Sequence, residues 1–476
     1  MKHFRLFITV LCLLFVCILP SCRGAEVSEE STTSAQQETE TLPEKENTIC
    51  IAERGKDAGF QLVYGLKDDE SPIAAYNLIK LIMAETDIEL TRVADMHANR
   101  EKNCEILIGT FNRAEYLEIY DTLNDDEYAI KTVIEGEKIK IVIAYKGVFA
   151  LMCAMERFTQ DYLKTENGIV TVPADIDVSG KFSEQDAMIV SSLPQLRDPC
   201  ILVEDGVYYA YGTRWIGFKN TSGDLRGEWE ELGVVAQIPE NAETNYWAPE
   251  VHKYNGAYYM FTTYRSSVTG HRGCTIMKSD KPEGPFVEIT NGHITPSDWD
   301  SIDGTFYVDP DGQPWMVFVH EWTSTDDGIG RMAAAKLSDD LTHFISEPVE
   351  LFRADDPSWS RAQVTDGCWM YRCEDGQLLM LWSNSDSAGY CVGIARSADG
   401  RVDGTWTQDK DLLYSKNMMG VKYDGGHGML FYDTDGQMYL SIHSPNGGGL
   451  DRPETPVFIP VREENGTIVW DIWKNK

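Results

Sequence analysis

The sequence DGVYYAYGT, which begins at Asp205, is the first of five similar phrases in the second half of the chain. Each phrase opens with Asp-Gly or Asn-Gly and continues with a run of aromatic and branched residues. The other four are NGAYYMFTTY from Asn255, DGQPWMVFVH from Asp311, DGQLLMLWSN from Asp375 and DGQMYLSIHS from Asp435. Such a dipeptide between two strand-like runs is the strongest short-range signal of a β-hairpin, because both central residues of the tight turn favour positive φ. The phrases therefore predict five hairpins.

The spacing of these hairpins indicates a repeat architecture. Successive turns are separated by 50, 56, 64 and 60 residues, so that five similar units fill the chain from about residue 190 to residue 476. Units of this length built from antiparallel strands are typical of β-propellers, in which each unit is one blade around a central channel. We therefore expect an all-β five-bladed β-propeller over 190–476.

One ionisable residue precedes each turn by five to nine residues, and these residues are Asp198, Glu250, Asp303, Asp366 and His427. Since a strand advances about 3.3 Å per residue, each lies at the far end of an innermost strand from its own turn. The innermost strands of a propeller line one channel, so four carboxylates and one imidazole are expected at the same mouth. Any one of them alone is more often a turn-forming or loop residue. Their common phase with the repeat indicates a functional site.

Tryptophan accompanies these carboxylates. All 12 Trp residues lie at or after position 215. Some of them are expected to fill space between blades, but five lie near expected strand ends or loops, where an indole face can stack on a sugar. These five are Trp215, Trp247, Trp299, Trp322 and Trp359. A carboxylate-rich pocket with aromatic residues predicts glycoside cleavage, in which one carboxyl donates a proton and a second attacks or activates water.

The five phrases and the residues before them resemble glycoside hydrolase family 43. RDPCILVEDGVYYAYGT is similar to the first blade of that family, NYWAPEVHKYNGAYYMFTTY to the second and SIDGTFYVDPDGQPWMVF to the third. VTDGCWMYRCEDGQLLMLWSN is similar to the fourth blade and DGGHGMLFYDTDGQMYL to the fifth. All five match in order, which implies a five-bladed propeller that cleaves glycosides with inversion of the anomeric configuration.

The resemblance also implies roles for individual residues. Asp198 would be the general base that activates water, and Asp303 would orient the acid and tune its pKa. His427 would stand in the channel and help to hold a hydrated cation such as Ca²⁺ or Na⁺, although no cofactor is required. The family usually carries its acid as Glu in a TEGP-like sequence, where this chain has Asp366. Because Asp reaches one methylene less far, Glu321, which the hairpin geometry places beside Asp303, is the alternative acid.

Other residues are expected to contact the substrate: Trp215, Trp247, Glu250, Glu321 and Arg452. We expect an exo-acting α-L-arabinofuranosidase, or a β-D-galactofuranosidase or β-xylosidase, that acts on an oligo- or polysaccharide. The loop lengths leave exo and endo action open. The alternatives are a non-catalytic glycan-binding propeller lipoprotein that has lost its acid, and a scaffold for protein interactions.

The N-terminus has the pattern expected of a targeting signal. A basic start precedes LFITVLCLLFVCIL, which is short for a membrane span and ordered like a secretory signal. The following LPSC resembles the bacterial lipoprotein box, so residues 1–22 are expected to be a lipoprotein signal peptide, with Cys22 lipidated. Residues 23–48 are rich in Glu, Ser and Thr and predict a flexible acidic linker. We expect a lipoprotein of the bacterial outer membrane or cell envelope that faces the periplasm or the cell surface.

Residues 49–182 alternate between strand and helix patterns and predict an α/β (α+β) domain. A helix opens at Ser71–Pro72, a buried strand follows at 104–111, a hairpin at 128–145 turns at Glu135–Gly136, and a helix covers 147–163. The first helix has an expected buried stripe of Ala75, Leu78, Ile79, Ile82 and Met83. This region is similar to the small N-terminal domains of some α-glucuronidases and β-hexosaminidases, and we expect an ancillary domain without a catalytic set.

The overall composition limits the partners. The formal net charge of −34 argues against nucleic acid or anionic lipid as a binding partner. It is compatible with an extracytoplasmic protein that acts on a neutral or weakly charged polymer. A length of 476 residues suits two folded domains.

Overall fold

A computed structural model describes residues 47–56, 59–96, 100–448 and 452–473. The expected signal peptide, its Cys22 and most of the expected acidic linker lie outside the described residues. The contacts of the chain group Asn47–Lys476 into one compact unit. Among the helices of the described ranges, none combines the length and the apolar character that a membrane crossing requires.

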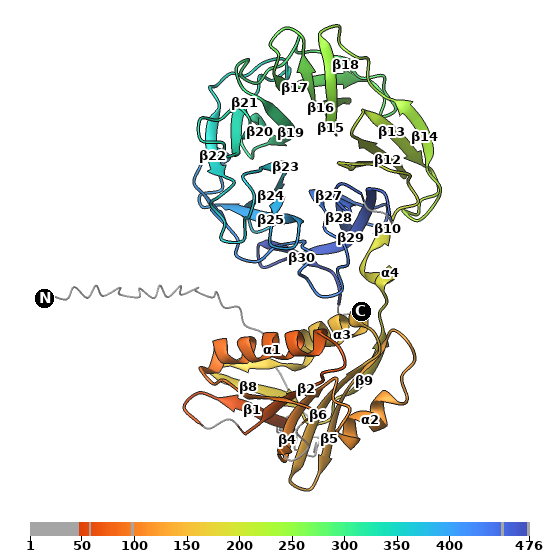
Figure 1. The fold of residues 1–476 in the computed structure, drawn as a ribbon, viewed down its shortest axis with the longest axis vertical. Coiled ribbons are helices and arrows are strands. Elements are labelled where there is room, and N and C mark those ends of the chain that lie inside the picture. Colours follow the sequence, from red (N-terminus) through yellow and green to blue (C-terminus); the bar gives the residue numbers. More distant parts are fainter. Residues whose placement is uncertain (1–46, 57–58, 97–99, 449–451, 474–476) are drawn as a thin grey trace, which may run out of the picture. The chain divides into compact units, whose positions relative to one another are not determined.

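The first part of the unit contains a six-stranded mixed sheet in the order β3-β2-β4-β6-β5-β9 and a three-stranded sheet in the order β1-β8-β7 (Figure 1). Strands β2, β3, β4 and β6 run parallel, whereas β5 is antiparallel to β6 and β9. The strands are β1 (Thr48–Glu53), β2 (Gln61–Tyr64), β3 (Thr91–Ala94), β4 (Cys104–Ile108), β5 (Glu127–Glu135), β6 (Lys138–Tyr145), β7 (Lys164–Glu166), β8 (Ile169–Pro173) and β9 (Asp177–Lys181). The predicted strand at 104–111 and the predicted hairpin at 128–145 are both found.

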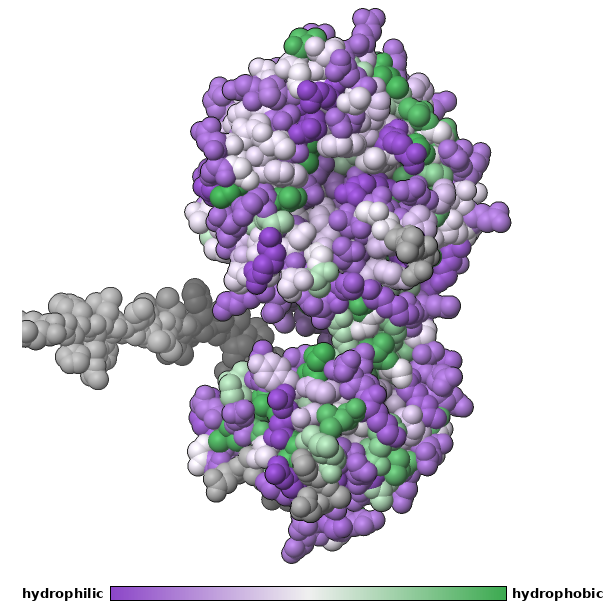
Figure 2. Space-filling view, in the orientation of Figure 1, coloured by the Kyte–Doolittle hydropathy of each residue, from purple (hydrophilic) through white to green (hydrophobic). Residues whose placement is uncertain are grey.

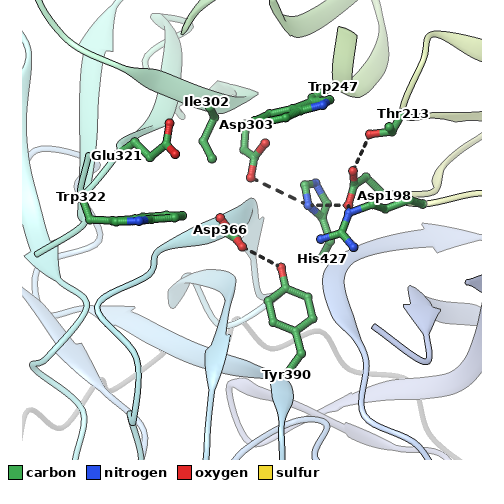
Figure 3. A pocket seen from close by; sticks show the side chains of 11 residues that line it. Asp198, Thr213, Trp247, Ile302, Asp303, Glu321, Trp322, Asp366, Tyr390 and His427 are labelled. Carbon is green, nitrogen blue, oxygen red and sulfur yellow. Dashed lines mark hydrogen bonds and ion pairs between the residues drawn. The ribbon is translucent and has the colours of Figure 1, made fainter. Parts of the chain in front are cut away.

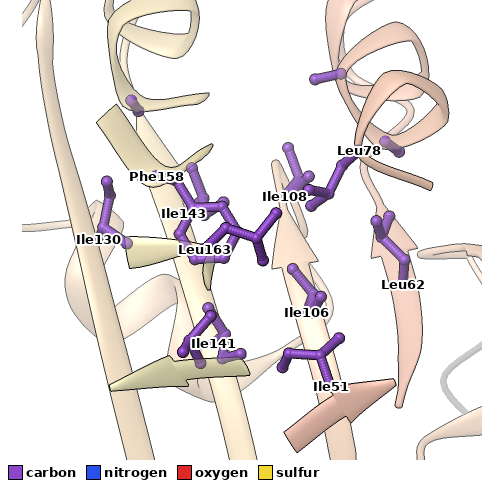
Figure 4. Close-up of a cluster of buried hydrophobic side chains, with 14 of the residues drawn as sticks. Ile51, Leu62, Leu78, Ile106, Ile108, Ile130, Ile141, Ile143, Phe158 and Leu163 are labelled. Carbon is purple, nitrogen blue, oxygen red and sulfur yellow. The ribbon is translucent and has the colours of Figure 1, made fainter. Parts of the chain in front are cut away.

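The described residues form four α-helices, of which α1 (Glu70–Thr86), α2 (Ala114–Tyr120) and α3 (Val148–Arg157) accompany these sheets. The short helix α4 (Glu184–Ala187) follows them and contacts β10 (Ile189–Val190). Helix α1 packs on the sheet through Leu78, whose neighbours in the cluster include Leu62 and Ile108 (Figure 4). The predicted stripe is wrong at Met83, which is 43% exposed. Met83 follows the buried Ile82 directly, and one step along a helix turns the side chain by about 100° away from the packed face. The predicted helix over 147–163 is α3, and it continues as the π-helical turn η2 (Phe158–Tyr162).

The second part of the chain forms five antiparallel sheets, named here sheets I to V (Figure 1). Sheet I contains β11 (Cys200–Glu204), β12 (Val207–Gly212), β13 (Ile216–Asn220) and β14 (Glu230–Val234), and sheet II contains β15 (Ala242–Tyr254), β16 (Ala257–Ser266), β17 (Arg272–Ser279) and β18 (Val287–Glu288). Sheet III contains β19 (Ser301–Val308), β20 (Pro314–His320), β21 (Arg331–Lys336) and β22 (Val349–Arg353), and sheet IV contains β23 (Asp366–Arg372), β24 (Leu378–Ser385), β25 (Tyr390–Ser397) and β26 (Trp406–Gln408). Sheet V contains β27 (Gly426–Tyr432), β28 (Met438–Ser444), β29 (Thr455–Glu464), β10 (Ile189–Val190) and β30 (Thr467–Trp470).

The five sheets follow one another around a common centre (Figure 1). The innermost strand is the first strand of the predicted hairpin in each sheet, which is β27 in sheet V. Strands β11, β15, β19, β23 and β27 contact one another in this order, and β27 also contacts β11. Sheet V contains both β10, from the start of this region, and β27 to β30, from its end. The pairing of β10 with β29 therefore joins the two ends of the region in one sheet, a feature that the sequence pattern did not indicate.

The hydrophobic phrases supply the packing between neighbouring sheets. Successive side chains of a strand point to opposite faces, so a sheet between two neighbours needs apolar residues at every position. In β20, Val317 and Val319 pack in a cluster with Trp382 of sheet IV. The alternate residue Phe318 packs in another cluster with Phe261 of sheet II. This double burial explains why each phrase is almost continuously hydrophobic.

All five predicted hairpins are present, but only two have the predicted turn geometry. Asp205–Gly206 and Asn255–Gly256 both have positive φ at their two central residues and connect directly paired strands. In the other three turns only the glycine has positive φ. At Asp311–Gly312, for example, the Gly312 N–H donates to the Asp309 carbonyl at 2.9 Å and the Asp309 N–H donates to Gln313 at 3.0 Å. This longer loop is the type that places only its glycine in the left-handed region.

The face of the molecule in Figure 2 is mostly hydrophilic, with hydrophobic residues scattered among polar ones. The exposed large hydrophobic residues include Val234 at the end of β14, Val268 between β16 and β17, and Ile345 between β21 and β22. Singly exposed hydrophobic residues are normal on a protein surface.

Candidate active site

A repeated backbone irregularity positions the candidate residues. Five residues at or just before the innermost strands have positive φ, between 40° and 56°: Asp198, Ala248, Asp303, Gly367 and His427. In sheets II to V the regular pairing of the innermost strand with its neighbour is interrupted at this point. Bulges of this kind re-aim side chains and are common beside active sites. Because non-glycine residues rarely adopt positive φ, four such residues in equivalent places indicate a functional constraint.

This series corrects the sequence-based alignment of the repeat at two positions. The prediction placed Glu250 and Asp366 in the same phase as Asp198. The structure has Ala248 at the equivalent place in sheet II and Gly367 in sheet IV. Asp366 therefore stands one residue before its bulge, and Glu250 stands two residues after its own.

The candidate site is a pocket of about 340 Å³ at the centre of the five sheets (Figure 3). It lies at the small end of the range for small-molecule sites. The residues that line it come from all five sheets or the loops beside them: Arg197, Asp198, Thr213, Trp247, Ile302, Asp303, Glu321, Trp322, Asp366, Tyr390 and His427. The structure thus brings Asp198, Asp303, Asp366 and His427 together, as the sequence predicted.

Asp198 is surrounded by groups that favour its ionised form. Thr213 donates a hydrogen bond to Oδ2 at 2.6 Å, and His427 Nδ1 and Arg197 Nε lie 3.3 and 3.5 Å from Oδ1. Burial acts to raise the pKa of this carboxyl, but His427, His443, Arg197 and the hydrogen bond from Thr213 together outweigh it and the pKa is lowered. The backbone N–H of Asp198 donates to Nδ1 of the buried His443 at 3.3 Å. Asp198 is therefore a fixed, ionised carboxylate.

Asp303 shares a charged partner, His427, with Asp198. His427 Nδ1 is 3.8 Å from Asp303 Oδ2, so the nearest oxygens of Asp198 and Asp303 are within about 7 Å, close enough for their charges to interact. Burial acts to lower the pKa of His427, but Asp198 and Asp303 raise it, which favours the imidazolium ion. The Gly367 N–H donates to the same Asp303 oxygen at 2.9 Å. Burial and the charge of Asp198 nevertheless raise the pKa of Asp303.

Asp366 is in the opposite state to Asp198. Burial and the neighbouring charge of Asp303 raise the pKa of Asp366 to about 8. The hydroxyl of Tyr390 donates to Asp366 Oδ2 at 3.2 Å. Asp366 is therefore a carboxylic acid at neutral pH and can give up a proton, whereas Asp198 can accept one. Figure 3 shows the two on different sides of the pocket.

Glu321, the alternative acid, follows the end of β20 and is held in an ion pair. Arg272 Nε donates to Glu321 Oε2 at 2.6 Å, and the same guanidinium contacts Asp300 at 3.3 Å and Thr323 at 3.0 Å. Burial raises the pKa of Glu321, while Arg272 opposes that rise. Protonation of Glu321 would weaken this ion pair, so its surroundings suit a hydrogen-bond acceptor better than a proton donor.

Three apolar side chains form the rest of the pocket wall: Trp247, Ile302 and Trp322. Figure 3 shows Trp322 extending toward Asp366 and Trp247 lying beside Asp303. The guanidinium of Arg272 lies over the Trp247 ring at 5.8 Å from its centre. These flat surfaces suit the C–H faces of a sugar ring.

Three predicted substrate contacts lie outside the pocket lining. Trp215 is 0% exposed, and its Nε1 donates to Thr262 at 2.6 Å inside the core that sheets I and II share. The Glu250 carboxylate contacts Nε2 of His252 at 3.0 Å. Arg452 donates to the Ser444 carbonyl at 2.9 Å, and its guanidinium lies over the ring of Tyr423.

Sequence reasoning missed four lining residues: Arg197, Thr213, Ile302 and Tyr390. Arg197 and Ile302 directly precede Asp198 and Asp303, so the bulges that position the carboxylates also position them. Thr213 follows the end of β12 as Glu321 follows the end of β20, and the reasoning that found Glu321 would have found it. Tyr390 opens the third strand of sheet IV, and no pattern distinguished it.

A cation near His427 would need ligand atoms that lie close together. Among the residues with described positions, one group of His, Cys, Asp and Glu has ligand atoms close enough together for a metal ion, and it is Cys373, Asp375 and Glu463. His427 does not belong to this group. An imidazolium ion has no free lone pair, so direct coordination by His427 does not fit its raised pKa.

Comparison with known proteins gives the family. The family model described as glycosyl hydrolases family 43 matches residues 190–462. The chain is 36% identical to a solved endo-arabinase from Bacteroides thetaiotaomicron, with a TM-score of 0.52 over 59% of this chain and 99% of that one. A thermostable family-43 glycoside hydrolase, 22% identical, shares the fold with a TM-score of 0.51 over 59% of this chain and 94% of that one.

Curated relatives are more distant. A probable arabinan endo-1,5-alpha-L-arabinosidase C of Aspergillus niger is 24% identical over 42% of this chain, and the match spans 63% of that protein. An extracellular endo-alpha-(1->5)-L-arabinanase of Bacillus subtilis is 26% identical over 27% of this chain and 44% of its own length, so the chain spans less than two thirds of either relative. An extracellular exo-alpha-(1->5)-L-arabinofuranosidase of Cellvibrio japonicus is 26% identical over 52% of this chain and 78% of that protein. The family match covers more than half of the chain, and the chain therefore belongs to glycosyl hydrolases family 43.

Proposed function

We propose that this protein is an inverting glycoside hydrolase that removes α-L-arabinofuranose from polysaccharide side chains. One observation carries the proposal: a single pocket holds a carboxyl with a lowered pKa, Asp198, and a carboxyl with a pKa of about 8, Asp366. Inverting hydrolysis needs one ionised and one protonated carboxyl on opposite faces of the sugar. The arabinan-cleaving relatives support arabinose as the sugar.

In the proposed reaction, a water molecule bound to Asp198 attacks the anomeric carbon and gives its proton to that carboxylate. The glycosidic C–O bond breaks, and the leaving oxygen takes the proton of Asp366. The fixed position of Asp198, with Thr213 on Oδ2 and His427 near Oδ1, supports its role as general base. Both carboxyls then return to their starting states by proton exchange with solvent.

Asp366 is the proposed general acid, and Glu321 the proposed contact for a sugar hydroxyl. The pKa of Asp366 keeps it protonated at neutral pH, and its neighbour Asp303 contributes to that pKa as the proposed modulator. Glu321 is engaged by Arg272, which favours an acceptor role. Trp247 and Trp322 are the proposed stacking surfaces.

The test is turnover of aryl α-L-arabinofuranosides, β-D-galactofuranosides and β-D-xylosides by wild type and three variants. Asp198→Ala is expected to lose about 10³-fold in rate on every substrate, because the base is gone. Asp366→Ala is expected to lose rate on a methoxyphenyl leaving group and to keep it on a dinitrophenyl group, which needs no proton. Glu321→Ala should mainly raise KM. The acid assignment is wrong if Glu321→Ala, and not Asp366→Ala, shows the leaving-group dependence.

Exo action is proposed because the pocket is small, while the 36% identity to an endo-arabinase favours endo action as the second candidate. Branched arabinan, which carries arabinofuranose side chains, separates the two. Free arabinose should be the first product of an exo enzyme, whereas an endo enzyme should release oligosaccharides and lower the viscosity at once. If no glycoside or polysaccharide is cleaved but arabinan retards the protein in affinity electrophoresis, the glycan-binding alternative replaces the enzyme.

We further propose that sheets I to V are the blades of a five-bladed propeller, as the order of contacts among their innermost strands supports. Residues 49–182 are the proposed ancillary α/β domain and 190–476 the proposed catalytic domain. This division is supported by the sheets, since no described strand before residue 182 pairs with one after residue 188. Limited proteolysis that leaves 190–476 intact and active would support it, and loss of folding after cleavage would contradict it.

Two smaller proposals concern the cation and the membrane. The charge near Asp198 and Asp303 comes from His427 itself, so no cofactor is required, and any Ca²⁺ or Na⁺ would reach His427 only through water. Dialysis against EDTA and sodium-free buffer should leave the rate unchanged.

A lipid anchor at Cys22 and a place in the bacterial cell envelope stay proposals from the sequence. Cys22→Ser should move the protein from the membrane fraction to the soluble fraction.

A further inference from the structure

Tyr390 makes the one hydrogen bond that the described residues offer to the Asp366 carboxyl, from its hydroxyl to Oδ2 at 3.2 Å. The terminal torsion of an aspartate is broad and nearly two-fold, so an unheld carboxyl can present either oxygen. A general acid works only if the oxygen that carries the proton faces the leaving group. A donor on one oxygen removes this ambiguity.

Tyr390 is itself held on several sides. Its backbone N–H donates to Asp424 Oδ2 at 3.1 Å, and its ring stacks on the buried His443 with 5.6 Å between ring centres. Gly426 allows the close approach of the ring, since a Cβ there would lie 2.5 Å from a Tyr390 ring carbon. The hydroxyl thus reaches Asp366 from a rigid support.

The hydroxyl of Tyr390 remains a donor over the working pH range. Burial and the nearby charge of Asp366 raise the pKa of this phenol well above its ordinary value. Only 5% of the residue is exposed, which leaves little of the ring for a sugar to stack on. Its contacts therefore suit a role that acts through Asp366 better than direct binding of substrate.

We propose that Tyr390 is a positioning residue that occupies Oδ2 of Asp366 and so keeps the transferable proton on Oδ1, toward the leaving oxygen. This inference rests on the proposed function and adds a residue to it. It also accounts for how an aspartate serves where the family usually has the longer glutamate: the hydrogen bond from Tyr390 restricts the shorter side chain to one orientation.

The kinetic test is Tyr390→Phe, alone and combined with Asp366→Ala, on aryl α-L-arabinofuranosides of good and poor leaving groups. Tyr390→Phe should lower kcat about 10- to 100-fold on the poor leaving group, the effect of losing one hydrogen bond to the carboxylate that develops as Asp366 gives up its proton. On the dinitrophenyl substrate the change should stay below about threefold, and KM should change little. In the Asp366→Ala background the same substitution should have no further effect, because a residue that acts through Asp366 has nothing left to position.

Tyr414→Phe is the matched control. Its hydroxyl donates to the Tyr423 carbonyl at 3.0 Å, so this variant also loses a buried tyrosine hydrogen bond but leaves Asp366 untouched. It should show no dependence on the leaving group. Equal losses for Tyr390→Phe on both leaving groups, or an additive loss in the double variant, would overturn the proposal.

A second readout does not depend on turnover. Carbon-13 NMR of aspartate labelled at Cγ follows the titration of Asp366, identified by its absence from Asp366→Asn. The charged groups around this carboxyl are Asp303, Asp198, His427 and Arg197. Since none of them changes in Tyr390→Phe, loss of the donor should raise the pKa of Asp366. An unshifted pKa would overturn the proposal even if no substrate is cleaved, whereas an inactive wild type with the expected shift would count against the proposed function alone.

Discussion

Asp198 and Asp366 have the same side chain and opposite states in one pocket. The difference comes from their neighbours, since His427 and Arg197 lie within 3.5 Å of Asp198 whereas the nearby charge that acts most on Asp366 is Asp303. Environment, rather than residue type, assigns the roles of base and acid.

The activity should follow pH with two limbs. Asp198 must be ionised, so kcat/KM falls at acid pH as this carboxylate is protonated, below the ordinary range of an aspartate because its pKa is lowered. Asp366 must be protonated, so kcat/KM falls as the pH rises through about 8. In Asp366→Ala, measured on a dinitrophenyl glycoside, the basic limb should disappear. A basic limb that persists in this variant would belong to another group.

At the scale of single elements, the bulge in each innermost strand re-aims the side chains beside it toward the pocket. Sheet IV has Gly367 at the bulge, where its N–H bonds Asp303 and its missing side chain makes room for His427. A Cβ at Gly367 would lie 2.7 Å from His427 Cγ.

Gly367→Ala tests this packing, with Gly376→Ala as its control. Both glycines have positive φ, but nothing lies within 4 Å of a Cβ at Gly376. The control should lose only the backbone cost, about 1–2 kcal/mol. Gly367→Ala should lose a further 1–3 kcal/mol from the overlap, by order of magnitude, and at least about tenfold in rate. Urea unfolding and turnover measure the two effects, and equal stability losses would contradict the packing account.

Hairpins were predictable from the sequence because their signal is local, whereas the bulges were not. The dipeptide at each turn located all five hairpins, and the ionisable residues before the turns included the four pocket residues Asp198, Asp303, Asp366 and His427, although Asp366 stands one residue before its bulge. Glu250 was the error in that series, since sheet II carries Ala248 at its bulge and the search for an ionisable group passed over it. An alanine gives no chemical signal.

The tryptophans illustrate a second limit. The sequence placed Trp215 and Trp247 alike near strand ends, but Trp215 precedes β13 in the core between sheets I and II, whereas Trp247 lies within β15 and faces the pocket. Which side a residue faces depends on its phase in the pairing, and a single step reverses it. Tyr390 was unpredictable for a related reason, because it lies on β25 and its partner Asp366 lies on β23, with β24 between them.

At the scale of the whole molecule, the pocket exists only if the five sheets hold together as a ring. The pairing of β10 with β29 joins the first and last parts of this region. The sequence predicted the units but not this closure, because a two-residue strand such as Ile189–Val190 has no periodicity to detect.

Ile189→Ala should weaken the closure, with Val190→Ala as the control in the same strand. Ile189 is 4% exposed and belongs to the core with sheet I, whereas Val190 is 46% exposed. Ile189→Ala is expected to cost about 2–4 kcal/mol of unfolding free energy, and Val190→Ala less than about 1 kcal/mol. Chemical denaturation gives both values. A small loss for Ile189→Ala would mean that the ring does not depend on this strand.

The stereochemistry of hydrolysis tests the central claim most directly, since it reports the face from which water attacks. If Asp198 activates water opposite a leaving group that Asp366 protonates, proton NMR of an aryl α-L-arabinofuranoside reaction should show β-L-arabinofuranose as the first product. If α-L-arabinofuranose forms first, a carboxylate of the pocket has attacked the sugar, and the assignment of Asp198 as a general base is wrong.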